Sequence, residues 1–155
     1  MILAFESSCD ETAMALVDAK GKVLLNCCLS QIELHNRYGG VVPELASRSH
    51  FDILDELTQR LQKAEKEKVF ERSQIQAVAA TMGPGLIGPL LVGANFARGI
   101  ASAWSKDFRG VHHLRGHLAS VLLDPQLEET YPGLTLIEKA QKIFPALVLL
   151  VSGGH

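Results

Sequence analysis

The sequence has few features of a secreted, membrane-spanning or free-standing nucleic-acid-binding protein. Of its 155 residues only Cys9, Cys27 and Cys28 are cysteines, without CxxC spacing, which excludes a disulfide framework and fits reduced thiols. No apolar run approaches the roughly 20 residues that a helix needs to cross a bilayer, and the first residues lack the basic start of a signal peptide. The net charge of -2 lacks the basic excess of a protein that binds nucleic acid alone. We therefore expect a cytoplasmic protein with no membrane partner.

The apolar content and length indicate one ordinary globular domain. Apolar residues make up 47% of the chain, and a domain of this size buries about 70% of its unfolded surface. The apolar pattern predicts strands at 2–5, 13–17, 23–29, 75–81, 108–112 and 144–151, and helices at 43–64, 89–104, 113–123 and 136–142. Residues 124–135 are expected to form a loop. The first three strands should form an antiparallel meander, so the order predicts an α/β fold, a mixed sheet with helices on its faces.

A polar segment, ESSCDET, separates the first two predicted strands. The hydroxyls of Ser7, Ser8 and Thr12 could hold phosphate oxygens as a phosphate loop, together with backbone N–H groups. The carboxylates of Asp10 and Glu11 could hold a divalent metal or orient a nucleophile. The alternative is a tight turn in which these short polar residues satisfy their own backbone.

Two histidines, His113 and His117, open the helix that follows the predicted strand 108–112. Residues at i and i+4 lie on one helical face, so both imidazoles can chelate one metal ion. The alternative is a pair of hydrogen-bonded histidines without a metal. Zinc peptidases with this spacing need Glu directly after the first histidine. Leu114 stands there, so peptide hydrolysis is not indicated.

Two glycine-containing segments follow predicted strands. GPGLIG at 83–88 formally matches GxGxxG, but the next strand ends without the acid of a dinucleotide site, so a tight turn near the site is the better interpretation. Val151, Ser152, Gly153 and Gly154 could bring N–H groups to a phosphate or ribose, or could form a plain turn.

The remaining polar candidates are expected to be structural. His35, Arg48 and His50 could face a partner, but they are interpreted as solvated positions, and Cys27 and Cys28 as small apolar residues of a strand. The helix 89–104 carries small side chains that would let it lie close to a sheet or another subunit.

Five segments in this order resemble the TsaD family, also called Gcp, and Kae in archaea and eukaryotes. They are ESSCDET at 6–12, GGVVPELAS at 39–47 followed by Arg48 and His50, GPGLIG at 83–88, HxxxH at 113–117, and LLVSGGH at 149–155. The resemblance implies an actin-like ATPase fold of two ribonuclease H-like lobes, of which this chain matches the N-terminal half. Residues 1–143 would be the first lobe, and 144–155 the first strand and glycine loop of a second lobe.

The resemblance also implies an activity. The family transfers a threonylcarbamoyl group from threonylcarbamoyl-adenylate to N6 of the adenosine beside the tRNA anticodon. His113 and His117 would be two ligands of one iron or zinc ion whose third ligand, an aspartate, lies in the second lobe. Asp10 and Glu11 would lie at the reacting end of the pocket. The site for the adenylate, an ATP-type nucleotide, would be lined by Leu150, Val151, Ser152, Gly153 and Gly154.

The implied partners are a paralogous TsaB-type subunit, a TsaE-type ATPase and the tRNA. The chain departs from the family at Arg115, where Glu is usual, in a longer connection after His117, and in lacking the second lobe, so we expect it to be inactive alone. A non-catalytic paralogous scaffold and a metalloendopeptidase are the alternatives. The histidine pair disfavours the first, and Leu114 the second. The strand 144–151 would expose an unpaired edge, and we expect it to pack back on the domain or to form a homodimer.

Overall fold

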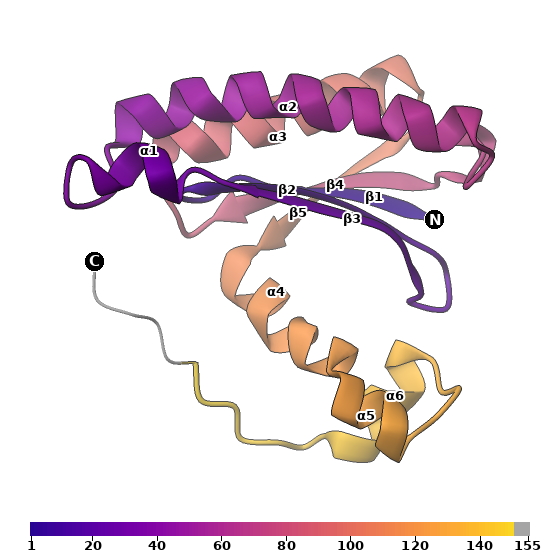
Figure 1. The fold of residues 1–155 in the computed structure, drawn as a ribbon. Helices are drawn as coiled ribbons and strands as arrows, with labels where there is room; N and C mark the ends of the chain where they lie inside the picture. The colour runs from indigo at the N-terminus through magenta and orange to yellow at the C-terminus, as the bar shows by residue number, and fades with distance from the viewer. Residues whose placement is uncertain (151–155) are drawn as a thin grey trace.

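Five strands form one mixed sheet in the computed structural model, which describes residues 1–150 (Figure 1). β1 (Ile2–Glu6), β2 (Glu11–Val17) and β3 (Val23–Ser30) make the expected antiparallel meander. β4 (Ala77–Gly83) pairs in parallel with β1, and β5 (Asp107–His112) in parallel with β4. The order β3-β2-β1-β4-β5, with these strand directions, is that of a ribonuclease H-like lobe of the actin-like fold. The predicted fold class is confirmed.

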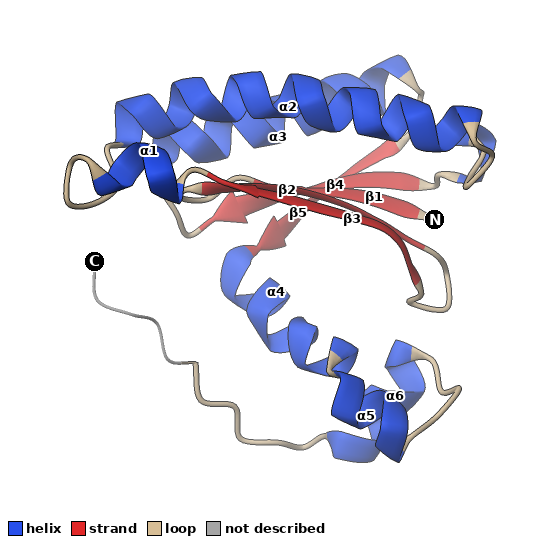
Figure 2. Cartoon of the chain, in the orientation of Figure 1, coloured by secondary structure: helices blue, strands red, loops and turns tan. Residues whose placement is uncertain are grey.

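Two long helices, α2 (Pro43–Lys66) and α3 (Ile87–Ala103), lie side by side over one face of this sheet (Figures 1 and 2). Pro43 suits the first turn of α2 because that position needs no N–H donor. Helix α2 buries Leu54, Leu57 and Leu61, which recur at the helical spacing. The small residues of α3 that face inward are buried, among them Ala97, so the prediction that this helix approaches the sheet closely is confirmed.

The strands bury alternate residues toward these helices, as a half-covered sheet requires. Leu3 and Phe5 of β1 and Met14 and Leu16 of β2 belong to the core. The residues between them point to the opposite face, where several are alanines. The two long helices thus cover one face, and the second face, which α4 borders, stays partly open.

The C-terminal helices lie on the side of the open face. α4 (His113–Ser120) leaves β5 and continues through a 3-10 turn (Val121–Leu123) into α5 (Pro125–Thr130) and α6 (Leu136–Ile143). In Figure 1 these helices descend from the sheet on the side away from α2 and α3. α6 matches the predicted helix.

Two short helices and one 3-10 turn were not predicted. α1 (Ile32–Asn36) follows β3, and a 3-10 turn (Arg72–Gln74) precedes β4. The prediction of a loop throughout 124–135 is wrong at α5. There the Asp124 carboxylate accepts a hydrogen bond from the N–H of Gln126 (2.7 Å), and Pro125 occupies the first helical position, so both helix-start signals were present.

The predicted strand 144–151 does not form over its described part, residues 144–150. Leu147 is 101% exposed and Leu149 84%, so this segment does not pack back on the lobe. A strand needs a hydrogen-bonded neighbour, and apolar sequence alone does not supply one. None of the helices formed within residues 1–150 combines the length and apolarity needed to cross a membrane.

Candidate functional site

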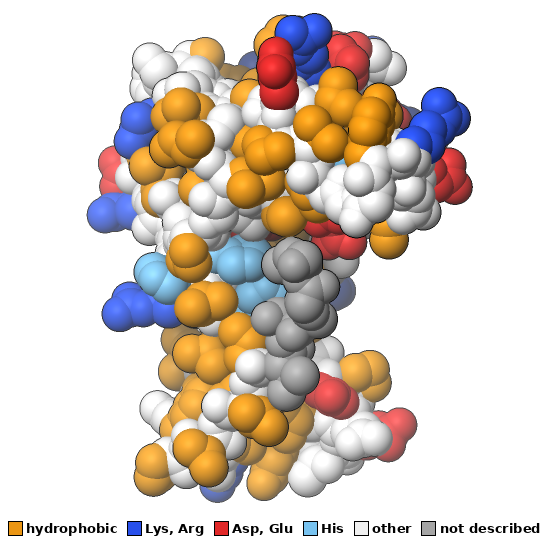
Figure 3. All heavy atoms as spheres, turned by 90° about the vertical axis from the view of Figure 1, so that its left-hand side faces the viewer, with side chains coloured by type: hydrophobic (Ala, Val, Ile, Leu, Met, Phe, Trp, Pro, Cys, Tyr) orange, Lys and Arg blue, Asp and Glu red, His pale blue; other side chains and the backbone are white. Residues whose placement is uncertain are grey.

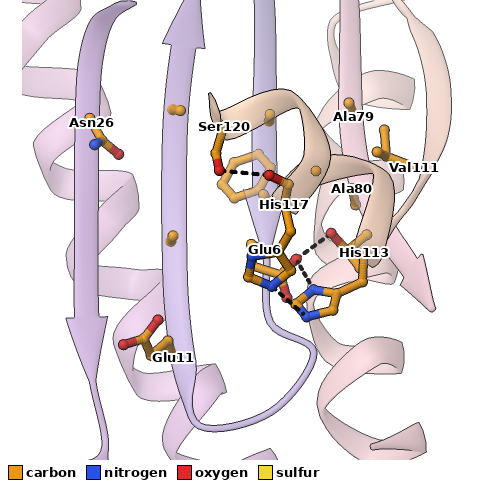
Figure 4. A pocket seen from close by; sticks show the side chains of 15 residues that line it. Glu6, Glu11, Asn26, Ala79, Ala80, Val111, His113, His117 and Ser120 are labelled. Atoms are coloured by element: carbon orange, nitrogen blue, oxygen red, sulfur yellow. Dashed lines mark hydrogen bonds and ion pairs between the residues drawn. The ribbon is translucent and has the colours of Figure 1, made fainter. Parts of the chain in front are cut away.

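A pocket of about 440 Å³ opens on the second face of the sheet, beside α4 (Figure 4). Small side chains of the central strands form its floor and leave room above the sheet. They are Ala4, Ala13, Ala15, Ala79 and Ala80. Polar side chains stand along its wall: Glu6, Glu11, Asn26, Thr81, His113, His117 and Ser120. The floor of the pocket is therefore apolar, with Glu6, His113 and His117 on one side and Glu11 and Asn26 on the other (Figure 4).

The two histidines of α4 face each other inside this pocket. Nε2 of His117 lies 3.0 Å from Nε2 of His113, and the rings meet edge to face with centroids 4.5 Å apart. The helical spacing thus brings both imidazoles to one face of α4, as predicted. In Figure 3, the pale blue histidine side chains lie at the level between the sheet and the C-terminal helices.

The facing nitrogens fit the geometry of a shared metal ion. Two imidazole nitrogens that each lie about 2.1 Å from one ion are roughly 3.0–3.4 Å apart, and the observed separation is 3.0 Å. Within residues 1–150, no group of three or more His, Cys, Asp or Glu side chains is arranged to hold an ion. The described residues can therefore supply two ligands, and any further ligand must come from elsewhere.

Glu6, which had no assigned role in the sequence analysis, connects this pair to the sheet. Its Oε2 lies 3.2 Å from Nδ1 of His113 and accepts a hydrogen bond from the Thr81 hydroxyl, while Oε1 accepts from the N–H of Ser8 (2.5 Å). Burial alone would raise the pKa of the Glu6 carboxyl, but the hydrogen bonds from Ser8, Thr81 and His113 outweigh it and hold the pKa below its usual value. The sequence did contain a signal for this role, because Glu6 is the only acidic residue of the otherwise apolar strand β1 and stands at its end.

The two acidic residues Asp10, in the loop after β1, and Glu11, at the start of β2, are placed differently. Glu11 is exposed and lines the pocket from the start of β2. Asp10 is half-buried and is not among the pocket-lining residues of the described chain. Its carbonyl oxygen accepts a hydrogen bond from the N–H of Gln31 (2.9 Å), which ties the loop to the end of β3.

The predicted phosphate loop stays a prediction, but the Ser7 and Thr12 hydroxyls are buried and bonded within the protein. The Ser7 hydroxyl, 3% exposed, donates to the carbonyl of Pro89 (2.9 Å), and the Thr12 hydroxyl, fully buried, bonds Nδ1 of His50 (2.7 Å). Ser8 is also buried, with its hydroxyl 3.1 Å from Nδ1 of His113. These hydroxyls bond residues of α2, α3 and α4, and so they join segment 7–12 to other parts of the protein.

His50 corrects another expectation, because it is fully buried and not solvated. Its Nε2 lies 3.0 Å from the carbonyl of Cys9, which can only accept, so Nε2 carries the proton and Nδ1 accepts from Thr12. Burial lowers the pKa of His50. The signal was available in sequence: position 50 continues the buried i, i+4 row of Ala46 and Leu54.

The other two residues that were expected to be solvated, His35 and Arg48, differ in their exposure. His35 is 2% exposed, also against expectation, and its Nε2 lies 3.2 Å from Oε1 of Gln31. Arg48 is exposed as predicted and pairs with Glu44 at 3.1 Å. Of the two adjacent cysteines in β3, Cys27 is buried as expected, whereas Cys28 is exposed.

The turn after β4 holds the loop between β1 and β2 in place. A Cβ added to Gly85 would lie 2.5 Å from the carbonyl oxygen of Ser8, and the φ of Gly85 is +159°. The N–H of Leu86 donates to that same oxygen (2.8 Å). Glycine is therefore needed because two loops meet here, and the interpretation of 83–88 as a tight turn near the site is confirmed.

The predicted adenylate-binding segment falls largely outside the described residues. Leu150 is 46% exposed and does not line the pocket. Val151, Ser152, Gly153 and Gly154 lie beyond residue 150, so their role stays a prediction.

Fold and site together define a ribonuclease H-like lobe with an i, i+4 histidine pair at one end of its central strands. The sequence profile of the TsaD family, described as tRNA N6-adenosine threonylcarbamoyltransferase, matches residues 22–155. The chain belongs to this family.

Two curated relatives carry the family's name. The chain is 43% identical over all its 155 residues to the tRNA N6-adenosine threonylcarbamoyltransferase of Carboxydothermus hydrogenoformans, and 46% to that of Burkholderia ambifaria. It covers 41% and 40% of their lengths.

Among solved structures, YeaZ from Pseudomonas aeruginosa aligns with a TM-score of 0.49 and 19% identity, covering 72% of this chain and 42% of that one. An uncharacterized protein with similarity to the peptidase YeaZ from the same organism aligns with a TM-score of 0.48 and 19% identity, covering 85% and 49%.

Proposed function

We propose that the chain acts as the N-terminal lobe of a tRNA N6-adenosine threonylcarbamoyltransferase. Family membership and the name of both curated relatives support this. The observation that carries it is the convergence of Nε2 of His113 and Nε2 of His117 at 3.0 Å, in a pocket that also contains Glu6 and Glu11.

In this proposal His113 and His117 hold one divalent iron or zinc ion as two of its ligands. When bound, such an ion supplies a Lewis acid that polarises a carbonyl group toward attack. The chain's own residues hold and orient the reactants. The exposed carboxylate of Glu11 accepts a hydrogen bond from the attacking amine, and Asp10 secures the loop through its carbonyl contact with Gln31.

The substrates and partners of this proposal follow from the family. The adenylate, an ATP-type nucleotide, would bind along Leu150 and residues 151–154, where a second lobe would begin at residue 144. A TsaB-type subunit, a TsaE-type ATPase and the tRNA complete the reaction in the cytoplasm. The relatives are more than twice as long as this chain, so we expect residues 1–155 to give no turnover alone.

Metal binding tests the site directly. The purified chain, equilibrated with Zn²⁺ or Fe²⁺ and then dialysed, should retain one ion per molecule by elemental analysis. His113→Ala and His117→Ala should each lose it, because a single imidazole does not chelate. Retention of the ion by either variant would place the metal elsewhere.

Activity is tested by adding the part of the relatives that this chain does not span. Residues 1–150 joined to the corresponding C-terminal portion of the Burkholderia ambifaria relative should form threonylcarbamoyladenosine in tRNA, measured by mass spectrometry of nucleosides, when threonylcarbamoyl-adenylate is supplied. The same chimera carrying His113→Ala is the matched control. A folded chimera that makes no product would contradict the transferase proposal.

A further inference from the structure

The Glu6 carboxylate joins three elements at one point. Glu6 is the last residue of β1, and it receives hydrogen bonds from the loop that follows, from Thr81 of β4, and from His113 at the start of α4. Glu6 and His113 are both half-buried, with about a third or less of each side chain exposed (32% and 27%). In Figure 4 a dashed line joins the Glu6 carboxylate to the His113 ring.

This arrangement determines which nitrogen of His113 carries a proton. An ionised carboxylate has only acceptor oxygens, so Nδ1 of His113 can bond Oε2 across their 3.2 Å separation only by donating, and the Ser8 hydroxyl, 3.1 Å from the same nitrogen, is a second acceptor for that proton. In a neutral imidazole the other nitrogen, Nε2, then has a free lone pair. That lone pair points at His117, whose Nε2 lies 3.0 Å away and therefore donates to it.

We propose that Glu6 is a positioning residue that holds His113 as its Nδ1–H tautomer and so presents the Nε2 lone pair to the pocket. The inference rests on the proposed function for its purpose, because a lone pair on Nε2 is what a metal ligand needs. Histidines that bind metals commonly donate their other N–H to a carboxylate, which fixes both tautomer and ring orientation.

A glutamine could not replace Glu6 in this role. The carboxylate accepts on both oxygens, from Ser8 at Oε1 and from Thr81 and His113 at Oε2. A side-chain amide has one oxygen and one NH₂ group, so at least one of these donors would face another donor. Glu6→Gln therefore keeps the size of the side chain while removing the hydrogen-bond pattern.

The tautomer can be measured without any metal. At about pH 8.5, where histidine is ordinarily neutral, ¹⁵N NMR of the imidazole rings should show His113 with a protonated Nδ1 and a bare Nε2, and His117 with a protonated Nε2. In Glu6→Gln the Nδ1–H signature of His113 should be lost. Thr81→Val removes a neighbouring donor but leaves the carboxylate, and Glu11→Gln removes a charge from the same pocket, so both should keep the wild-type tautomer.

Metal affinity supplies a second readout. Competition titration of the 155-residue chain with Co²⁺ or Zn²⁺ should show binding weakened about 10- to 100-fold in Glu6→Gln, the usual effect of losing such a partner. On adding Zn²⁺ to the wild type, His117 should also change to its Nδ1–H form, since both Nε2 atoms then bind the ion. Circular dichroism and thermal unfolding identify any variant that fails to fold.

The outcomes separate the two proposals. A wild-type His113 with a protonated Nε2, or a folded Glu6→Gln with unchanged tautomer, would overturn the inference about Glu6 even if metal binds. A second outcome is a wild type that binds neither ion but shows the Nδ1–H tautomer of His113, which Glu6→Gln then loses. That outcome would overturn the metal site and leave the positioning role of Glu6 supported.

Discussion

At the scale of single residues, a buried histidine holds the acidic loop that borders the pocket. His50 extends from α2 to the loop between β1 and β2, where it bonds the Cys9 carbonyl at 3.0 Å and the Thr12 hydroxyl at 2.7 Å. These contacts lie on either side of Asp10 and Glu11. The position of both carboxylates therefore depends on a residue of a different element.

His50→Ala should lower the free energy of unfolding by about 2–4 kcal/mol, because it leaves a cavity and two buried polar groups without partners. Urea denaturation measures the change. Arg48→Ala, on the exposed side of the same helix, should change stability by about 0.5 kcal/mol or less. Equal effects of the two substitutions would contradict the structural role of His50.

His50 should also make the stability of the protein depend on pH. Burial lowers the pKa of His50, and His35 lowers it further. The Cys9 carbonyl, Glu6 and Asp10 raise the pKa, but their contributions are smaller and do not reverse the shift. The unfolded chain then takes up the proton first as pH falls below about 6.5, so this contribution to stability is complete above that pH and is lost below it. The fall in unfolding free energy between pH 7 and pH 5 should be smaller in His50→Ala than in the wild type.

At the scale of elements, the approach of α3 to the end of β1 depends on glycine at one position. A Cβ added to Gly93 would overlap the Ser7 hydroxyl, which is itself bonded to Pro89 at the start of α3. Gly99 lies on the same helix with nothing within 4 Å of such a Cβ. A side chain at position 93 would therefore clash with Ser7, whereas a side chain at position 99 would meet open space.

Gly93→Ala should destabilise the chain by about 1–3 kcal/mol through overpacking. Gly99→Ala should be neutral or stabilise by up to about 1 kcal/mol, because alanine is the better helix former. Thermal unfolding of both variants measures the difference. A stabilising Gly93→Ala would show that α3 lies farther from β1 than the structure indicates.

At the scale of the whole molecule, apolar surface remains exposed on the side away from α2 and α3. Leu114, Leu118, Val121 and Ile137 are between 39% and 69% exposed along the C-terminal helices. Figure 3 shows hydrophobic side chains gathered over that part of the molecule. Segment 144–150 adds Leu147 and Leu149 to this surface.

We expect the 155-residue chain to associate with itself at high concentration, since exposed apolar patches of this kind mark contact surfaces. Analytical ultracentrifugation should show a dimer that dissociates on dilution. Leu147→Lys combined with Leu149→Lys should weaken it, whereas Lys142→Ala on α6 should not. A wild type that stays monomeric throughout would contradict the predicted homodimer.

Local patterns were sufficient for most of the fold and for part of the site. The apolar alternation of β1 to β3 and the helical spacing of Leu54, Leu57 and Leu61 depend only on neighbouring residues, as does the i, i+4 spacing of His113 and His117. Such features were predicted correctly. The strand expected at 144–151 was not found over 144–150, because a strand depends on a partner elsewhere in the molecule.

The sequence by itself determined most of the strands and the long helices, because backbone geometry and side-chain periodicity act over a few residues. Only the tertiary structure decided that Glu6 meets His113, that His50 turns inward to Thr12, and that Ser7 bonds Pro89. These contacts join residues 38 to 107 positions apart. The contact of Glu6 with His113 arises because parallel pairing of β1, β4 and β5 brings their carboxyl ends together, and the other two arise because α2 and α3 pack against the sheet.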